Sequence, residues 1–168
     1  KTKRRDNSAM AVVFVSDTGV WWVEDIIYGR WTPQETAERI FSVVDKYKPV
    51  AMGIEKGIAQ QAVMEPLQDL MRRTARVFRI DLLSHGNQKK QDRILWALQG
   101  KFEHGKIKLK KVYWNIEFGD EASAFPSQLV HDDLLDALSY TDQMAILPYS
   151  MGGDIEDDYE PFDAVAGY

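Results

Sequence analysis

The chain has 168 residues, of which 45% are hydrophobic and 28% charged, a balance typical of one globular domain with its own core. It contains no cysteine, which excludes disulfides, thiol catalysis and cysteine-based zinc sites. The longest wholly apolar stretch, residues 9–15, is too short to cross a bilayer.

The net charge of −5 is unevenly distributed along the chain. Residues 150–168 contain six acidic residues and no lysine or arginine, so the rest of the chain has 21 basic and 20 acidic residues. Residues 86–111 alone hold eight basic residues and two acidic ones. A polyanion is therefore an allowed partner. We expect residues 1–148 to form the folded domain and residues 149–168 to form an acidic tail.

The first half of the chain predicts a hairpin followed by alternating helices and strands. Residues 8–16 and 20–28 are rich in β-branched and aromatic residues on either side of the turn Asp17-Thr18-Gly19, which predicts a β-hairpin. Thr32 and Pro33, with Glu35 near the capping-box position, predict the start of a helix over residues 33–47. A strand covered on both faces is expected over residues 50–55, a helix over 59–73 and a strand over 76–80.

The second half is predicted to be mostly helical. We expect helices over residues 89–102, 113–124 and 130–146, with a brief strand over residues 107–109. A hairpin followed by alternating helices and strands predicts an α/β fold, with a central mixed sheet flanked by helices on both faces.

Glu55 is the first candidate for chemistry. It stands at the carboxyl end of an apolar strand, where open α/β sheets place their ligands. An equally simple interpretation is a strand-end acid that pairs with Lys56 or caps the next helix.

The motif His131-Asp132-Asp133-Leu134-Leu135-Asp136 is the second candidate. Asp132 and Asp133 lie four and three residues before Asp136, so the three acids share one helical face, which is unfavourable without a positive group opposite. They could be N-cap and first-turn acids, which the helix dipole stabilises. Capping does not explain Asp136, which lies a turn further in, whereas a divalent metal ion would.

Other hydrolytic chemistries lack their motifs. The sequence contains no HExxH zinc motif, no GxSxG nucleophile elbow and no GxxxxGK[ST] phosphate loop. The remaining ligands are carboxylate oxygens, which Mg²⁺ and Mn²⁺ prefer. Two such ions would activate a water molecule and stabilise the leaving oxygen in phosphodiester cleavage.

These residues carry a resemblance to a known family. The segments RRDNSAMAVV, VAMGIEKG, GNQKKQDRILWAL, FEHGKIKL and above all HDDLLDAL resemble the nuclease domain of tailed-bacteriophage terminase large subunits, over residues 5–144. The resemblance implies the ribonuclease H-like fold of the retroviral-integrase superfamily. It also implies two bound divalent ions, Mg²⁺ or Mn²⁺, and cleavage that leaves 3′-hydroxyl and 5′-phosphate ends.

The resemblance also implies roles for particular acids. Glu55 matches the family's central acid, Asp132 and Asp133 match the pair at the start of the last helix, and Asp136 is a nearby alternative ligand. His131 stands where some members carry a histidine beside the metals. Asp6, taken alone a turn residue, matches a further acid found just after the first strand in several members. The family's first-strand aspartate normally precedes a segment like KTKRRDNSA, so we expect that strand to lie ahead of Lys1 or Asp6 to serve instead.

Basic residues in two segments are candidates for binding the DNA backbone. They are Lys89, Lys90 and Arg93 at the start of a predicted helix, and Lys106, Lys108 and Lys110 on one side of a predicted strand. The alternative for the first group is a solvated helix face. No aromatic residues alternate with these cations, so we expect little sequence preference.

The resemblance implies a metal-dependent endonuclease that cleaves concatemeric double-stranded DNA at the initiation and termination of viral genome packaging. Its expected partners are an ATPase domain upstream of this segment, the portal protein and the small terminase subunit, in the host cell cytoplasm rather than in the mature virion. Two alternatives stay open: a Holliday-junction resolvase-like nuclease of the same fold, and a non-cleaving module that docks on DNA or on the portal.

Overall fold

The computed structural model describes residues 8–84, 86, 88–127 and 131–145. Asp6 and the acidic tail over residues 149–168 lie outside these ranges. No helix in the described part of the chain is long and apolar enough to cross a membrane.

The hairpin predicted near the start of the chain is confirmed. Strand β1 (Ser8–Val15) pairs antiparallel with β2 (Trp21–Gly29), and a bulge interrupts the register between Val12 and Val13. Gly19 closes the turn with φ of 74°, a conformation that glycine adopts without strain. The predicted short strand, β5 (Ile107–Leu109), pairs parallel with the other edge of β2, so the sheet order β1-β2-β5 is mixed.

Two further strands form a parallel pair. Strand β3 (Met52–Glu55) and β4 (Ile80–Leu83) are joined by helix α2 (Ile58–Thr74), which continues through Pro66. Met10 of β1 packs in the same apolar cluster as Met52 and Ile54 of β3, so this pair lies next to the hairpin.

Further helices lie in the described part of the chain. They are α1 (Pro33–Tyr47), α3 (Lys90–Glu103), α4 (Asn115–Ala124) and α5 (Asp133–Ser139). The capping box predicted for α1 is confirmed: the Thr32 hydroxyl accepts from the Glu35 N–H, and the Glu35 carboxylate accepts from the Thr32 N–H at 2.8 Å.

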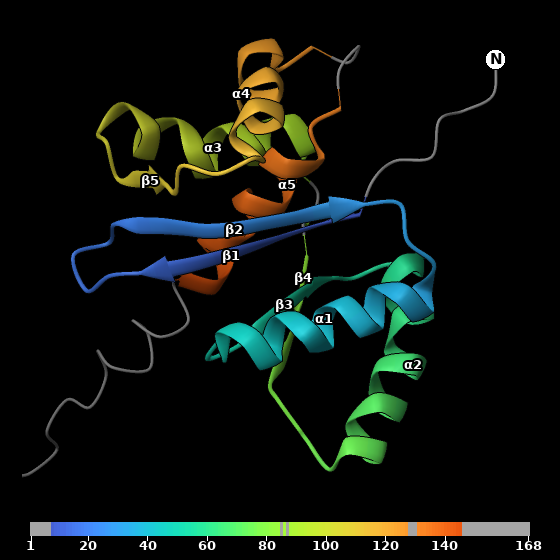
Figure 1. Cartoon of the computed structure of the whole chain (residues 1–168). Coiled ribbons are helices and arrows are strands. Elements are labelled where there is room, and N and C mark those ends of the chain that lie inside the picture. The colour runs from blue at the N-terminus through green and yellow to red at the C-terminus, as the bar shows by residue number, and fades with distance from the viewer. Residues whose placement is uncertain (1–7, 85, 87, 128–130, 146–168) are drawn as a thin grey trace, which may run out of the picture.

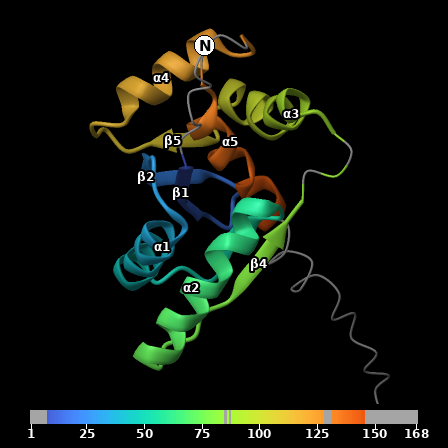
Figure 2. The same ribbon diagram turned by 90° about the vertical axis from the view of Figure 1, so that its right-hand side faces the viewer.

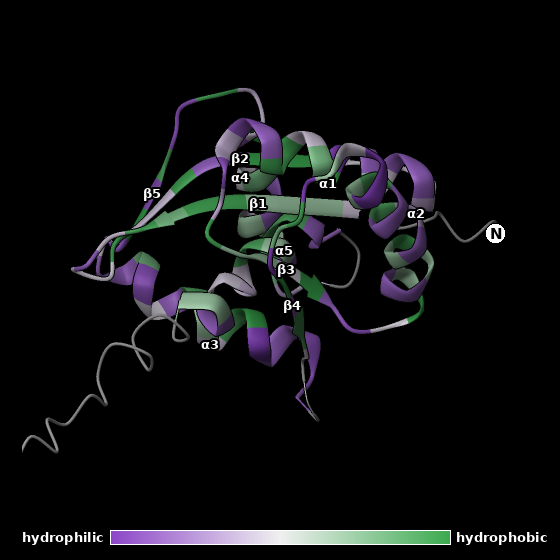
Figure 3. Ribbon diagram, turned by 90° about the horizontal axis from the view of Figure 1, so that it is seen from below, coloured by the Kyte–Doolittle hydropathy of each residue, from purple (hydrophilic) through white to green (hydrophobic). Residues whose placement is uncertain are grey.

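Helices cover both sides of the strands, as predicted for this α/β fold. Figures 1 and 2 show α1 and α2 on one side of the β1-β2 hairpin and α3 and α4 on the other. Each side has its own core. One cluster contains Trp21, Ile26, Ile94, Trp114 and Leu134, and the other contains Ala37, Ile40, Val63, Leu67 and Met71. Coloured by hydropathy, β1 is largely apolar while α1, α2 and α3 alternate between polar and apolar turns (Figure 3), as expected for helices with one buried face.

The prediction of a strand over residues 76–80 is wrong. The strand begins at Ile80, because β3 has only four residues and Met52 pairs with Ile80. Phe78 instead packs edge-on against Phe41 of α1, at a ring distance of 6.0 Å. The prediction that residues 50–55 form a strand covered on both faces is also wrong in part: Val50 is 90% exposed, and the strand begins at Met52.

The last helix differs from the single helix predicted over residues 130–146. It begins at Asp133 and is interrupted at Tyr140, after which residues 141–145 are again helical. Residues 130 and 146 lie outside the described ranges. The start is set by Glu121 of α4, whose carboxylate accepts from the N–H groups of Leu134 and Leu135.

Candidate active site

Glu55 is the last residue of β3, at the carboxyl end of the parallel β3-β4 pair. Helix α2 begins after Gly57, which has no side chain with which to cap it. Gly53 lets this strand approach its neighbours closely. A Cβ atom there would lie 2.5 Å from Leu83 Cδ1 of β4 and 2.6 Å from Met144 Sδ.

Two of the acids at the start of α5 share one lysine. The Lys90 Nζ atom lies 2.7 Å from Asp132 Oδ1 and 3.1 Å from Asp136 Oδ2. Burial alone would lower the pKa of Lys90, but the hydrogen bond to Asp132 and the charges of both aspartates outweigh it and raise that pKa. The positive group that this acidic face requires is therefore supplied by α3.

Arg93 binds Asp136 and two further residues at the C-terminal end of α5. Its side chain is only 7% exposed, donates to a carboxylate oxygen of Asp136, and donates to the Ser139 hydroxyl at 2.5 Å. Its guanidinium also lies over the Tyr140 ring, 4.0 Å from the ring centre. Asp136 is thus held by both Arg93 and Lys90, which does not fit the alternative ligand role that the resemblance gave it.

Tyr140 links this network to Glu55. Burial is the main cause that raises the pKa of Tyr140, and a hydrogen bond to the Glu55 carboxylate raises it further. Glu55 is thereby placed beside the end of α5. Tyr140 follows Asp133 by seven residues, which is about two helical turns or roughly 10 Å along the axis.

Glu121 of α4 caps the N-terminus of α5. Its carboxylate accepts from Leu134 N at 2.9 Å and Leu135 N at 3.2 Å, whereas Asp132 stands at the N-cap without a side-chain hydrogen bond to the helix. The interpretation of Asp132 as a capping acid is therefore not supported. Burial, reinforced by the nearby charges of Asp133 and Asp132, raises the pKa of Glu121 to about 7, and its two backbone hydrogen bonds oppose the rise.

Asp133 and His131 form a second pair at the same helix start. His131 Nδ1 lies 3.7 Å from Asp133 Oδ2, and the Asp133 side chain is only 12% exposed. The structure thus divides the acids: Asp132 and Asp136 point toward α3, and Asp133 lies beside His131.

The carboxylates have the donor chemistry that Mg²⁺ and Mn²⁺ prefer, but their arrangement does not form a metal site. Within the described ranges, no three histidine, aspartate or glutamate side chains come together closely enough to hold an ion. Glu55, on β3, contacts Tyr140 at the C-terminal end of α5, whereas Asp132 and Asp133 lie at the N-terminal end of that helix. Asp132 is also bound by Lys90. The convergence of these acids around an ion stays a prediction.

The candidate DNA-binding residues fall into different environments. Lys89 is exposed at the N-cap of α3, whereas Lys90 is engaged by the aspartates and Arg93 is buried. The interpretation of Arg93 as a phosphate-binding residue is therefore wrong, because its guanidinium faces the interior. Lys106, Lys108 and Lys110 are exposed around β5, opposite the buried Ile107, and Lys110 pairs with Glu24.

Sequence reasoning missed Glu121 and Tyr140. A signal for Glu121 was present: Trp114, Phe118 and Glu121 follow helical spacing, which places the carboxylate on the apolar face of α4. Tyr140 had no comparable signal, because an aromatic residue in an apolar helix pattern is usually a core residue.

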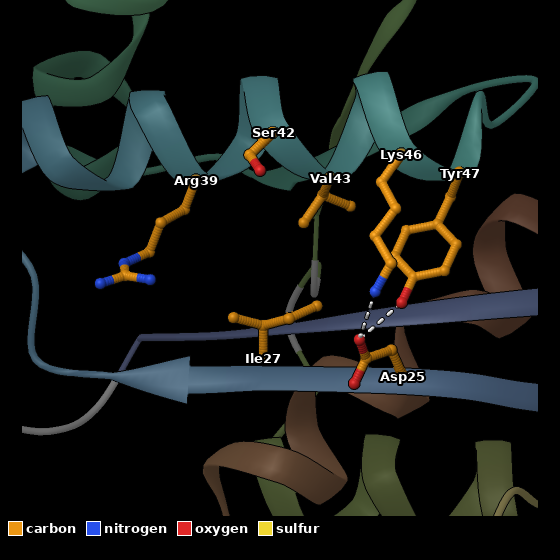
Figure 4. Close-up of a pocket in the computed structure, with 7 residues that line it drawn as sticks. All are labelled: Asp25, Ile27, Arg39, Ser42, Val43, Lys46 and Tyr47. Carbon is orange, nitrogen blue, oxygen red and sulfur yellow. Dashed lines mark hydrogen bonds and ion pairs between the residues drawn. The ribbon is translucent and has the colours of Figure 1, made fainter.

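A small pocket elsewhere lacks comparable chemistry. It measures about 150 Å³ and lies between β2 and α1, where Tyr47 donates to Asp25 at 2.6 Å and Lys46 lies 3.7 Å from the same carboxylate oxygen (Figure 4). Its single carboxylate is already engaged by these two groups, so the acids around α5 remain the stronger candidate.

The comparisons with known proteins decide the family. The family model described as the terminase RNaseH-like domain matches residues 1–144. The chain belongs to the terminase RNaseH-like domain family. This membership, with the mixed α/β architecture, confirms the expected ribonuclease H-like fold and makes the chain a nuclease-type domain.

One solved structure with a similar chain is the Thermus thermophilus RuvC structure. It is 12% identical in sequence, covers 86% of this terminase RNaseH-like domain chain and 87% of its own, and gives a TM-score of 0.45. No curated protein matches the sequence.

Proposed function

We propose that this terminase RNaseH-like domain is a divalent-metal-dependent endonuclease, which cuts concatemeric double-stranded DNA at the start and end of viral genome packaging. The observation that carries the proposal is the first turn of α5 in a chain of this family. It holds Asp132 and Asp133 side by side, and the N–H groups of Leu134 and Leu135 are capped by Glu121 of α4 and not by Asp132.

In this proposal Glu55, Asp132 and Asp133 are the carboxylates that bind one or two Mg²⁺ or Mn²⁺ ions, and Asp6 assists them. Asp6 lies outside the described residues, and the acids as arranged are not yet gathered around an ion. Binding therefore requires Asp132 to leave Lys90 and Glu55 to reorient. Glu55 is exposed and ends its strand, so its side chain has room to move.

DNA would lie across the exposed lysines. Lys106 and Lys108 project from the surface around β5, and Lys89 projects from the start of α3. Contacts of this kind bind phosphates without reading the sequence. The packaging role implies an ATPase domain, the portal protein and the small terminase subunit as partners, with cutting in the host cytoplasm during virus assembly.

Plasmid cleavage in Mn²⁺ tests the nuclease proposal. We expect Glu55→Gln and Asp133→Asn to lower the cleavage rate by about two orders of magnitude or more, because loss of a ligand carboxylate removes charge stabilisation from the reaction. The matched control is Glu38→Gln, an exposed acid on α1, which should cut like the parent chain. Circular dichroism must show that every variant is folded.

If folded Glu55→Gln and Asp133→Asn both cut at the parent rate, the proposal is wrong. If the parent chain binds DNA but never cuts it in Mg²⁺ or Mn²⁺, a docking module describes this segment better.

A further inference from the structure

Lys90 stands between two carboxylates of one helix face. Asp132 and Asp136 are four residues apart, so their charges repel each other along α5. The Lys90 ammonium lies 2.7 Å from an oxygen of Asp132 and 3.1 Å from an oxygen of Asp136, which is how a cation would neutralise this pair.

The two aspartates differ in how firmly they are held. Asp136 has a second partner in Arg93, whose side chain is almost fully buried and is itself fixed by Ser139 and Tyr140. Asp132, in contrast, is paired with the side chain of Lys90, which is 43% exposed and is the first residue of α3. Lysine has a flexible four-carbon stem and can swing into solvent without disturbing the core.

We infer that Lys90 is a built-in competitor of the divalent cation: it neutralises Asp132 in the metal-free chain and is displaced from Asp132 when the ion binds. This inference rests on the proposed function, in which Asp132 is a metal ligand. Asp136 stays with Arg93 throughout, so the exchange affects one carboxylate and leaves the attachment of α5 to α3 intact. Lys90 thereby sets the ion concentration at which the domain is loaded.

Isothermal titration with Mn²⁺ in the absence of DNA measures the competition directly. Removing the Lys90 ammonium should tighten Mn²⁺ binding by about threefold to tenfold, the effect expected from one partly exposed ion pair. The variant is Lys90→Met, which keeps the aliphatic stem. Lys90→Arg keeps a competing charge and should bind Mn²⁺ like the parent chain.

Lys89→Met is the matched control. Lys89 is exposed and precedes Lys90 directly, so this variant removes the same charge from the neighbouring position. It corrects for the general effect of net charge on cation affinity. Equal Mn²⁺ affinity in Lys90→Met and Lys89→Met, with clear binding by the parent chain, overturns the competition but leaves the proposed function intact. Absence of Mn²⁺ binding in all four proteins overturns both.

If Lys90→Met binds Mn²⁺ and the other three proteins do not, the result supports the competition, because Lys90 then prevents binding altogether. Circular dichroism and a melting curve for each variant in EDTA check that the helices remain folded, so that a loss of affinity is not mistaken for unfolding.

Discussion

Glu121 accepts hydrogen bonds from Leu134 and Leu135 through one carboxylate oxygen, and its other oxygen is buried without a hydrogen-bond partner among the described residues. The side chain is 3% exposed, and burial raises its pKa to about 7. This acid joins α4 to the first turn of α5, next to Asp132 and Asp133, so its ionisation affects the start of that helix.

The raised pKa predicts how stability depends on pH. Between the unfolded value of 4.5 and about 7, the folded chain keeps a proton on Glu121 that the unfolded chain has lost. The contribution of Glu121 to the free energy of unfolding therefore falls as pH rises through this window. Glu121→Gln stays neutral, so its stability relative to the parent chain should rise by roughly 2 kcal/mol from pH 5 to pH 8.

Urea unfolding of both proteins at several pH values measures this difference. Glu65→Gln, at an exposed position of α2, serves as the control and should follow the pH dependence of the parent chain. A constant difference between Glu121→Gln and the parent from pH 5 to pH 8 would contradict the account.

Single residues also show what the sequence could predict about the site. Glu55 and the acids at the start of α5 stand out because a carboxylate beside an apolar strand or helix requires an explanation. The partners that hold them do not stand out. Arg93 looks like a surface cation from its basic neighbours, and its burial follows only from the packing of α3 against α5.

At the scale of elements, β3 reaches its position because Gly53 has no side chain. A methyl group there would collide with Leu83 of β4 and with Met144, which follows α5. Gly53→Ala should therefore push β3 outward and lower the free energy of unfolding by about 1–3 kcal/mol. Because Glu55 ends the same strand, cleavage of plasmid DNA should fall as well.

Gly100→Ala provides a contrast within the same chain. Gly100 lies inside α3 and a Cβ atom there meets nothing within 4 Å, so alanine should stabilise the helix by up to about 1 kcal/mol. Guanidinium unfolding compares the two variants. An equal effect of both substitutions would show that the close approach at Gly53 is unimportant.

Elements with local signals were predictable, and those fixed by distant partners were less so. The start of α1 follows from Thr32, Pro33 and Glu35, which form its capping box and first turn. The bounds of β4 depend on which residues lie opposite the four residues of β3, and the start of α5 depends on Glu121. The hydrophobic periodicity of the sequence identifies neither the strand that pairs with β4 nor the acid that caps α5.

At the scale of the whole molecule, residues 1–148 are nearly neutral in net charge, and the net negative charge lies in the predicted acidic tail. Residues 149–168 carry six acidic residues, and lysines are exposed around β5. We propose that the tail competes with DNA for these lysines. Truncation after Pro148 should then raise DNA affinity at low salt, and the gain should shrink as salt screens the charges.

Fluorescence anisotropy with a short DNA duplex at several salt concentrations measures the effect of the truncation. A tail variant with its acids replaced by amides should behave like the truncation if charge is the cause. Unchanged affinity at low salt would contradict the competition.

The central claim is that Glu55, Asp132 and Asp133, which are far apart in the sequence, gather around divalent ions beside α5. Crystals grown with Mn²⁺ and measured at the manganese absorption edge would locate the ions directly. We expect anomalous density between Glu55 and the Asp132–Asp133 pair, with Lys90 moved away from Asp132. If crystals grown in a saturating concentration of Mn²⁺ show no ion between these carboxylates, and Lys90 is still bound to Asp132, the account is contradicted.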